Sequence, residues 1–251
     1  MNSSLFRLRE WRGWVALGVL ACLFLPGCTP SADSNQVQSI QAVRVTSPNR
    51  AWNALKQAAA KDAKVQSYNV KIYVHALHPT SSGDLTVHGS VGTNQDAIFQ
   101  IRVGRESYQV YQTRDRGYYE YGGVWQAWKH PLTLRWFNDY ESLLRWAEQH
   151  HCSLQRRPQK FVGGEFCTVY QVWIPAKLGD PPGPWRSLGR PVGDALYTFA
   201  VGNRDGALYQ VTTTQSLATT SGLTTLTTDA IFSDLGAGIQ VEPPSGFSER
   251  R

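Results

Sequence analysis

Between residues 68 and 128 the chain alternates apolar and polar residues with a period of two, in short stretches separated by turns. Such alternation predicts half-buried β-strands. Since no helical pattern interrupts them, successive strands should pair in an antiparallel sheet. Gly122-Gly123 is a strong hairpin signal between the last two strands. The predicted strands cover residues 68–74, 85–91, 97–103, 107–112, 118–121 and 124–128.

Helices are predicted on both sides of this segment. Ser47 and Pro48 have the residue types of an N-cap and a first helical position, and apolar residues then recur at helical spacing to about Val65. A second helix should begin at Pro131 and end near Gln149, with a wide apolar stripe.

The remainder of the chain predicts further strands. They cover residues 166–174, 195–201, 207–215 and 224–232. Five Pro and four Gly between 175 and 193 predict a long ordered loop or flap. The nine threonines between 212 and 228 are expected at solvent-facing strand positions.

The N-terminus has the pattern of an export signal. Basic residues precede an uncharged apolar run from Trp14 to Leu25, shorter than the roughly 20 residues that span a membrane. The following Leu25-Pro26-Gly27-Cys28 resembles the lipobox of bacterial lipoproteins. The resemblance implies cleavage after Gly27 and a diacylglyceryl thioether on Cys28. The alternative is a simple N-terminal anchor helix with a buried Cys28.

This interpretation divides the chain into four segments. Residues 1–27 are the signal peptide, 28–46 the lipidated cysteine with a polar tether, 47–246 the folded domain and 247–251 a tail. Removing the signal changes the formal charge from +6 to +4, because three Arg and one Glu are lost with it. A mildly basic domain suits the anionic extracytoplasmic face of a cell membrane, and export argues against a nucleic-acid partner.

Two further cysteines remain in the mature chain, Cys152 and Cys167. In an oxidising compartment their spacing allows a disulfide, which is the favoured prediction. Two free buried thiols are the alternative.

Three stretches resemble the half-barrel lipoproteins of the LolA/LppX-like group. They are the helix-to-strand entry over Ala51–Tyr68, the Tyr-rich hairpin over Tyr118–Trp125, and the ending Ile231-Phe232-Ser233-Asp234-Leu235-Gly236 followed by Glu242-Pro243-Pro244. The resemblance implies an α+β fold, in which a strongly curved antiparallel sheet carries helices on its concave face. It also implies a lipid-binding or sensing role in the cell envelope, since the lipobox places this chain among the lipidated members.

Catalytic and metal-binding patterns are weak. His75 and His78 would point to opposite faces of a strand, and no carboxylate is spaced to complete a metal site with them or with His150-His151. No Ser lies in a nucleophile elbow. We therefore expect no enzyme activity, metal or cofactor.

Aromatic residues are concentrated around the second predicted helix, and they are the candidate lining of an apolar ligand site. The alternative is that most of them fill the core themselves, because each inward-packed ring removes room for a ligand. The candidates are Trp125, Trp128, Trp136, Phe137, Tyr140 and Trp146, with Trp185 and Leu188 in the predicted flap at the mouth.

Basic residues form two small clusters, Arg114-Asp115-Arg116 and Arg156-Arg157 with Lys160. They are either ordinary solvated loop residues or contacts for lipid phosphates.

The sequence thus predicts a non-catalytic, membrane-anchored envelope lipoprotein that binds lipid or another apolar ligand between sheet and helices. The alternative is an interaction or sensor module with a self-filled groove, contacting a protein partner or the membrane.

Lipidation is tested by Cys28→Ser. Without the thiol no thioether can form, so the variant should stay unprocessed or move from the membrane to the soluble fraction. The measurement is metabolic labelling with a radioactive fatty acid, with Cys22→Ser as the matched control that keeps its label. Unchanged labelling of Cys28→Ser would contradict the prediction.

Overall fold

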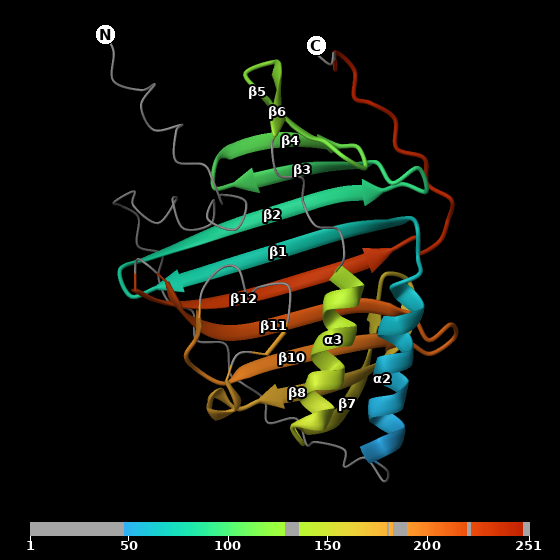
Figure 1. Ribbon diagram of the computed structural model, residues 1–251, viewed down its shortest axis with the longest axis vertical. Coiled ribbons are helices and arrows are strands. Elements are labelled where there is room, and N and C mark those ends of the chain that lie inside the picture. Colours follow the sequence, from blue (N-terminus) through green and yellow to red (C-terminus); the bar gives the residue numbers. More distant parts are fainter. Residues whose placement is uncertain (1–47, 129–135, 180, 183–189, 220–221, 248–251) are drawn as a thin grey trace.

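The computed structural model describes residues 48–128, 136–179, 181–182, 190–219 and 222–247. Its centre is one 12-stranded sheet with the strand order β6-β5-β4-β3-β2-β1-β12-β11-β10-β8-β7, in which β9 pairs with β11 beside this path (Figure 1). Every strand pair is antiparallel. The strands are β1 (Tyr68–His78), β2 (Ser81–Val91), β3 (Ala97–Val103), β4 (Glu106–Gln112), β5 (Gly117–Tyr121), β6 (Val124–Trp128), β7 (Ser153–Val162), β8 (Glu165–Ile174), β9 (Arg190–Pro191), β10 (Ala195–Gly202), β11 (Leu208–Thr219) and β12 (Gly222–Ser233).

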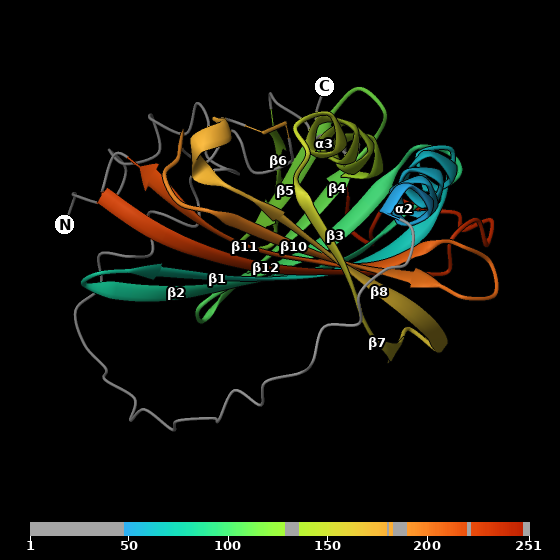
Figure 2. The ribbon, with the colours of Figure 1, turned by 90° about the horizontal axis from the view of Figure 1, so that it is seen from below.

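The two long helices, α2 (Pro48–Asp62) and α3 (Trp136–Gln149), lie on one side of this sheet (Figure 2). A short 3-10 helix, η3 (Ala176–Leu178), follows β8. The sheet curves around the helices and does not close, because β6 and β7 remain separate edges. The predicted α+β fold, a curved antiparallel sheet with helices on its concave face, is therefore confirmed. In the described part of the chain, no helix is long and apolar enough to cross a membrane.

Alternation along the central strand β1 shows how the sequence selects the concave face. Val70, Ile72 and Val74 are buried, whereas Lys71 and Tyr73 between them are exposed. A period of two places alternate side chains on opposite faces. The apolar set therefore faces the helices, and the polar set faces outward.

The helices bury the apolar stripes that their sequences predict. In α2, Leu55 and Ala59 are buried, and in α3, Tyr140 and Leu144 are buried. An ion pair joins the helices, with 2.5 Å between Lys56 Nζ and Glu148 Oε2. The second helix is described from Trp136 onward, so its predicted start at Pro131 lies outside the described residues.

Strand β7 is absent from the predicted set, for a physical reason. Its sequence lacks clean alternation and contains Pro158, which usually argues against a strand. Because β7 is the last strand of the sheet, only one of its edges needs hydrogen bonds, and the register shifts between Arg157 and Lys160 around this proline. An edge position therefore accommodates a sequence that a central strand would not.

The residues after β12 pack on the outer face of β3–β6. Val241 and Phe247 join Tyr111 and Tyr118 in a second apolar cluster. The Phe247 ring centroid lies 4.8 Å from that of Tyr118 and 5.0 Å from that of Tyr111. Structured contacts thus extend into the segment that was expected to be a tail from residue 247.

A buried carboxyl group attaches α2 to the sheet. Asp62 is the last residue of α2 and is fully buried, and its Oδ2 accepts a hydrogen bond of 2.5 Å from the Leu208 backbone N–H. Its Oδ1 has no hydrogen-bond partner. Burial raises the pKa of Asp62 to about 7, although the Leu208 bond and nearby Lys61 act in the opposite direction.

This raised pKa predicts a pH-dependent stability. Between about pH 4 and pH 7 the unfolded chain releases the Asp62 proton, whereas the folded protein retains it, so the free energy of unfolding should fall as pH rises through this window. The pKa of about 7, against an ordinary 3.8, limits the loss to roughly 4 kcal/mol. Asp62→Asn should remove this dependence and be more stable than the wild type at pH 8, measured by urea unfolding from pH 4 to pH 8.

Exposed Asp115 provides the matched control, since Asp115→Asn should leave the wild-type pH profile in place. A profile that is unchanged in Asp62→Asn, or a loss of stability at pH 8, would contradict the assignment.

Candidate functional site

The part of the concave face beneath the helices is filled by the protein's own aromatic rings. Phe137 of α3 packs against Phe232 and Tyr68, with ring centroids 4.6 and 5.4 Å apart. Tyr140 lies edge-on to Phe199 at 6.0 Å. Each of these five residues is at most 3% exposed. The predicted aromatic helix therefore supplies core here.

Of the four candidate lining residues whose side chains the structure describes, three belong to the core at α3 and one lies on the other face of the sheet. Phe137 and Tyr140 are core residues, and Trp146 is half-buried and stacks on His150 with 4.1 Å between ring centroids. Trp125 lies on the opposite face of the sheet, where it packs against Phe247 at 5.5 Å, so its placement with α3 was wrong. The side chains of Trp128 and Trp136, and the residues Trp185 and Leu188, lie outside what the structure describes.

The same concave face continues over β2, β3 and β4, beyond the described helices (Figure 1). Leu85 and Val87 of β2 pair with Val103 and Ile101 of β3, and all four side chains are half-buried. Tyr108 of β4 continues the row opposite Ile101. We call this set of five residues the concave apolar strip. The two described helices cover another part of the concave face, so the apolar side chains of the strip contribute to the protein surface.

Gly89 positions the aromatic ring at the inner end of this strip. It pairs with Val70 on one side and Phe99 on the other. A Cβ on Gly89 would approach Phe99 Cδ1 to 2.2 Å, so only glycine allows the ring to lie over β2. Phe99 is 2% exposed and belongs to the main core, against which Leu85, Val87 and Ile101 of the concave apolar strip also pack.

Tyrosines form the far border of the strip. The Tyr119 hydroxyl donates a 2.6 Å hydrogen bond to Gln126 Oε1, and the Tyr108 hydroxyl bonds to Glu106. Tyr121 is 62% exposed and its ring stacks on that of Tyr108 at 6.2 Å. The strip is thus apolar along β2 and β3 and gains hydroxyl groups toward β5.

The prediction that the threonines of residues 212–228 face solvent was wrong for three of them. Thr213, Thr224 and Thr228 are at most 3% exposed on the concave face. Their strands cross the centre of the sheet, so the side of the pleat that faces the helices is buried whatever the residue type. The hydroxyls of Thr213, Thr224 and Tyr140 have no hydrogen-bond partner among the described residues. A buried hydroxyl without a partner costs roughly 1–3 kcal/mol.

A groove of about 600 Å³ crosses the outer face of β12, β1, β2, β3 and β4. Its lining mixes polar and apolar surface, and the Ser90 hydroxyl donates to Asn69 Oδ1 at 2.5 Å inside it. The lining residues are Asn69, Val70, Lys71, His88, Gly89, Ser90, Ile98, Phe99, Gln100, Gln109, Gly163, Ile231 and Ser233.

The predicted disulfide is not formed. Cys152 and Cys167 are both free and buried. Ser153, next to Cys152, pairs with Trp173 at one end of the β7–β8 hairpin, whereas Cys167 pairs with Lys160 near the other end. Burial raises the pKa of both thiols, that of Cys167 to about 11, so neither is poised as a thiolate nucleophile.

Two histidines form contacts with residues close to them in the sequence. His75 Nδ1 lies 2.7 Å from Asp84 Oδ1, and His150 Nδ1 lies 2.8 Å from the Trp146 carbonyl oxygen. Within the described ranges, no three side chains of His, Cys, Asp or Glu gather as metal ligands.

The residues of the concave apolar strip were absent from the predicted site. Their signal is present in the sequence as the alternate apolar positions of the strands predicted over 85–91 and 97–103. Alternation identifies which residues share a face, but it does not show where two helices end over a sheet of twelve strands.

No protein-family model matches this chain, and no curated protein does either. Among solved structures it is similar to the lipoprotein LppX of Mycobacterium tuberculosis, with 12% identity and a TM-score of 0.49 over 78% of this chain and 100% of that one. It is similar to LprF of Mycobacterium bovis, with 16% identity and a TM-score of 0.49 over 78% and 97%. A LolA superfamily protein of Nitrosomonas europaea gives 12% identity and a TM-score of 0.32 over 76% and 94%.

Proposed function

We propose that this protein is a non-catalytic cell-envelope lipoprotein, tethered through lipidated Cys28, that binds a lipid or another apolar ligand on its concave face. The observation that carries the proposal is the concave apolar strip of β2, β3 and β4. It differs from the site expected from the sequence because it lies beside the aromatic core of α3 instead of beneath it.

The two faces of β3 support this assignment. Ile101 and Val103 face the concave side, whereas Gln100 and Arg102 on the other side are exposed. In an ordinary antiparallel sheet with one face in water, a strand is polar on that face and fully packed on the other. In β3 the face opposite the polar one is only half packed. Half-buried apolar side chains next to a curved wall are typical of ligand-binding or interaction surfaces.

The chemistry of the strip indicates the class of ligand. Leu85, Val87 and Ile101 offer aliphatic contacts with no charge among them, which suits acyl chains. The hydroxyls of Tyr108 and Tyr119 at the border can also hydrogen-bond an ester or hydroxyl group. A ligand with hydrocarbon chains and a small polar linkage would match both parts.

A second function is favoured by one specific observation. The interface beneath α3 is already filled by Phe137, Tyr140 and Phe232. A domain with a self-filled groove would use the concave apolar strip to contact a protein partner, as an envelope sensor or interaction module.

The experiment is lipid extraction from the purified domain, comparing Val87→Trp with Thr86→Trp. An indole at Val87 fills the strip, whereas the same indole at Thr86 lies on the outer face of β2. Lipid recovered per mole of protein should fall at least about fivefold in Val87→Trp, equivalent to roughly 1 kcal/mol of lost contact. Thr86→Trp should retain the wild-type amount. Native mass spectrometry identifies the class of the extracted molecule.

A second pair of variants is needed in case the strip accommodates the indole introduced at Val87. Ile101→Glu places a charge in the strip, and Gln100→Glu places the same charge on the outer face. Thermal unfolding by circular dichroism shows that each variant is folded. Equal lipid content in all folded variants, or a wild-type domain that carries no lipid and takes none up from envelope extracts, would leave the interaction module as the better assignment.

A further inference from the structure

Two exposed phenylalanines form the tip of the β7–β8 hairpin. Phe161 and Phe166 are paired across the strands, with ring centroids 5.1 Å apart, and they are 61% and 63% exposed. The turn between them contains Gly163 and Gly164 with φ of 58° and 87°, the left-handed conformation of a tight hairpin turn. The rings therefore project from a short, well-defined turn.

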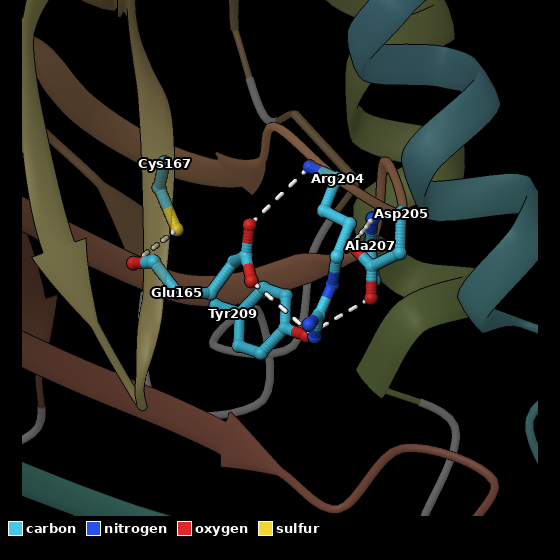
Figure 3. Close-up of polar contacts among 6 residues, drawn as sticks. All are labelled: Glu165, Cys167, Arg204, Asp205, Ala207 and Tyr209. Carbon is cyan, nitrogen blue, oxygen red and sulfur yellow. Dashed lines mark hydrogen bonds and ion pairs between the residues drawn. The ribbon is translucent and has the colours of Figure 1, made fainter.

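Internal contacts hold this tip against the neighbouring β10–β11 turn (Figure 3). Glu165 Oε1 accepts a hydrogen bond of 3.3 Å from the Arg204 backbone N–H, and Glu165 Oε2 lies 3.4 Å from Arg204 Nη2. The Asn203 backbone N–H donates to the Phe166 carbonyl at 2.9 Å. Asp205 accepts from the Tyr209 hydroxyl at 2.9 Å and the Ala207 N–H at 3.0 Å. Both acidic side chains are thus engaged within the protein.

Basic residues occur on the elements next to this hairpin tip, although Lys160 and the Glu165 that pairs with Arg204 lie on the opposite face of the hairpin from the two phenylalanines. Arg204 has 80% of its side chain exposed even while it is paired with Glu165. Arg156 is exposed on β7, and Lys160 is half-buried beside Phe161. Lys61, at the end of α2, is exposed and donates to the Asp205 carbonyl at 2.5 Å. We call these residues, together with Phe161 and Phe166, the basic-aromatic tip.

We infer that the basic-aromatic tip docks on an anionic membrane surface. Phenylalanine rings insert at the boundary between headgroups and acyl chains, while lysine and arginine remain at the phosphates. A solvated charge cluster would not explain two large apolar rings at the same point. Four basic side chains, those of this tip, stand against the two acidic side chains of Glu165 and Asp205, so the net charge of this region is positive.

The predicted anchor is compatible with this contact. The predicted tether, residues 29–46, has 18 residues, and an unstructured chain of that length has a root-mean-square end-to-end distance of about 23 Å. Helix α2, which separates the tether from the tip, has 15 residues and a length of about 22 Å. A lipid on Cys28 and the basic-aromatic tip can therefore reach the same membrane.

The test is vesicle co-sedimentation of residues 30–251, which contain every described element and lack the anchor. The probes are vesicles of phosphatidylglycerol and phosphatidylcholine at 1:1 and vesicles of phosphatidylcholine alone, at low and high salt. We expect binding to the anionic vesicles at low salt. The double variant Phe161→Ser/Phe166→Ser should lower the partition coefficient about tenfold, and Arg156→Gln about fivefold.

The outer face of the central strands supplies the matched control. Leu77 of β1 and Leu223 of β12 are each 52% exposed and lie outside the concave apolar strip. Leu77→Ser/Leu223→Ser removes similar apolar surface and should bind anionic vesicles like the wild type. Three results would overturn the proposal: equal binding by the Phe161/Phe166 variant, equal loss in the control, or absence of vesicle binding together with a dimer that only the Phe161/Phe166 variant abolishes. Vesicle binding by the tip does not depend on whether the concave face carries lipid. The docking proposal and the proposed lipid binding can therefore fail separately.

Discussion

The pairing of β1 with β12 joins the two halves of the molecule. Nine residues of β1, from Asn69 to Leu77, lie opposite Thr225–Ser233. On one side of this seam β1–β6 form a meander, and on the other side β7–β12 carry the packing surface for α2. Because side chains alternate along each strand, this register also fixes which residues face inward in both halves. A slip of one residue would place Lys71 and Asp229 in the core, and neither the helices nor the apolar strip would have a continuous wall.

The helices cover this wall unequally, and the proposed function depends on that asymmetry. Beneath α2 and α3 the protein supplies its own aromatic filling, with Phe137 and Phe232 in direct contact. Beyond them the wall remains apolar over β2 and β3, but its side chains are only half-buried. The proposed ligand would contact the part of the wall that lies beyond the two described helices. Beneath the helices the hydroxyls of Thr213 and Tyr140 are buried without a hydrogen-bond partner in the described part of the chain.

Local pattern was sufficient to predict most of the sheet and both helices, because alternation and helical spacing are properties of neighbouring residues. Local pattern did not predict features that depend on where distant parts of the chain meet in the fold. Strand β7 was missed because an edge position tolerates Pro158. Trp125 was assigned to the wrong face because the register of β5 with β6 places it beside the C-terminal Phe247. The expected disulfide failed because Cys152 and Cys167 are close in sequence but lie toward opposite ends of a long hairpin.

The most direct test of the account is paramagnetic broadening of methyl signals in the isotopically labelled domain, with 16-doxyl stearate as the probe. Ile101 and Ile98 lie on the same strand but on opposite faces, so they provide the comparison within one spectrum. The account predicts that the nitroxide broadens the methyl signals of Val87 and Ile101 and leaves those of Ile98 and Ile231 sharp. Broadening confined to the outer face, or no broadening at saturating probe, would contradict the claim that the concave face is the ligand-binding surface.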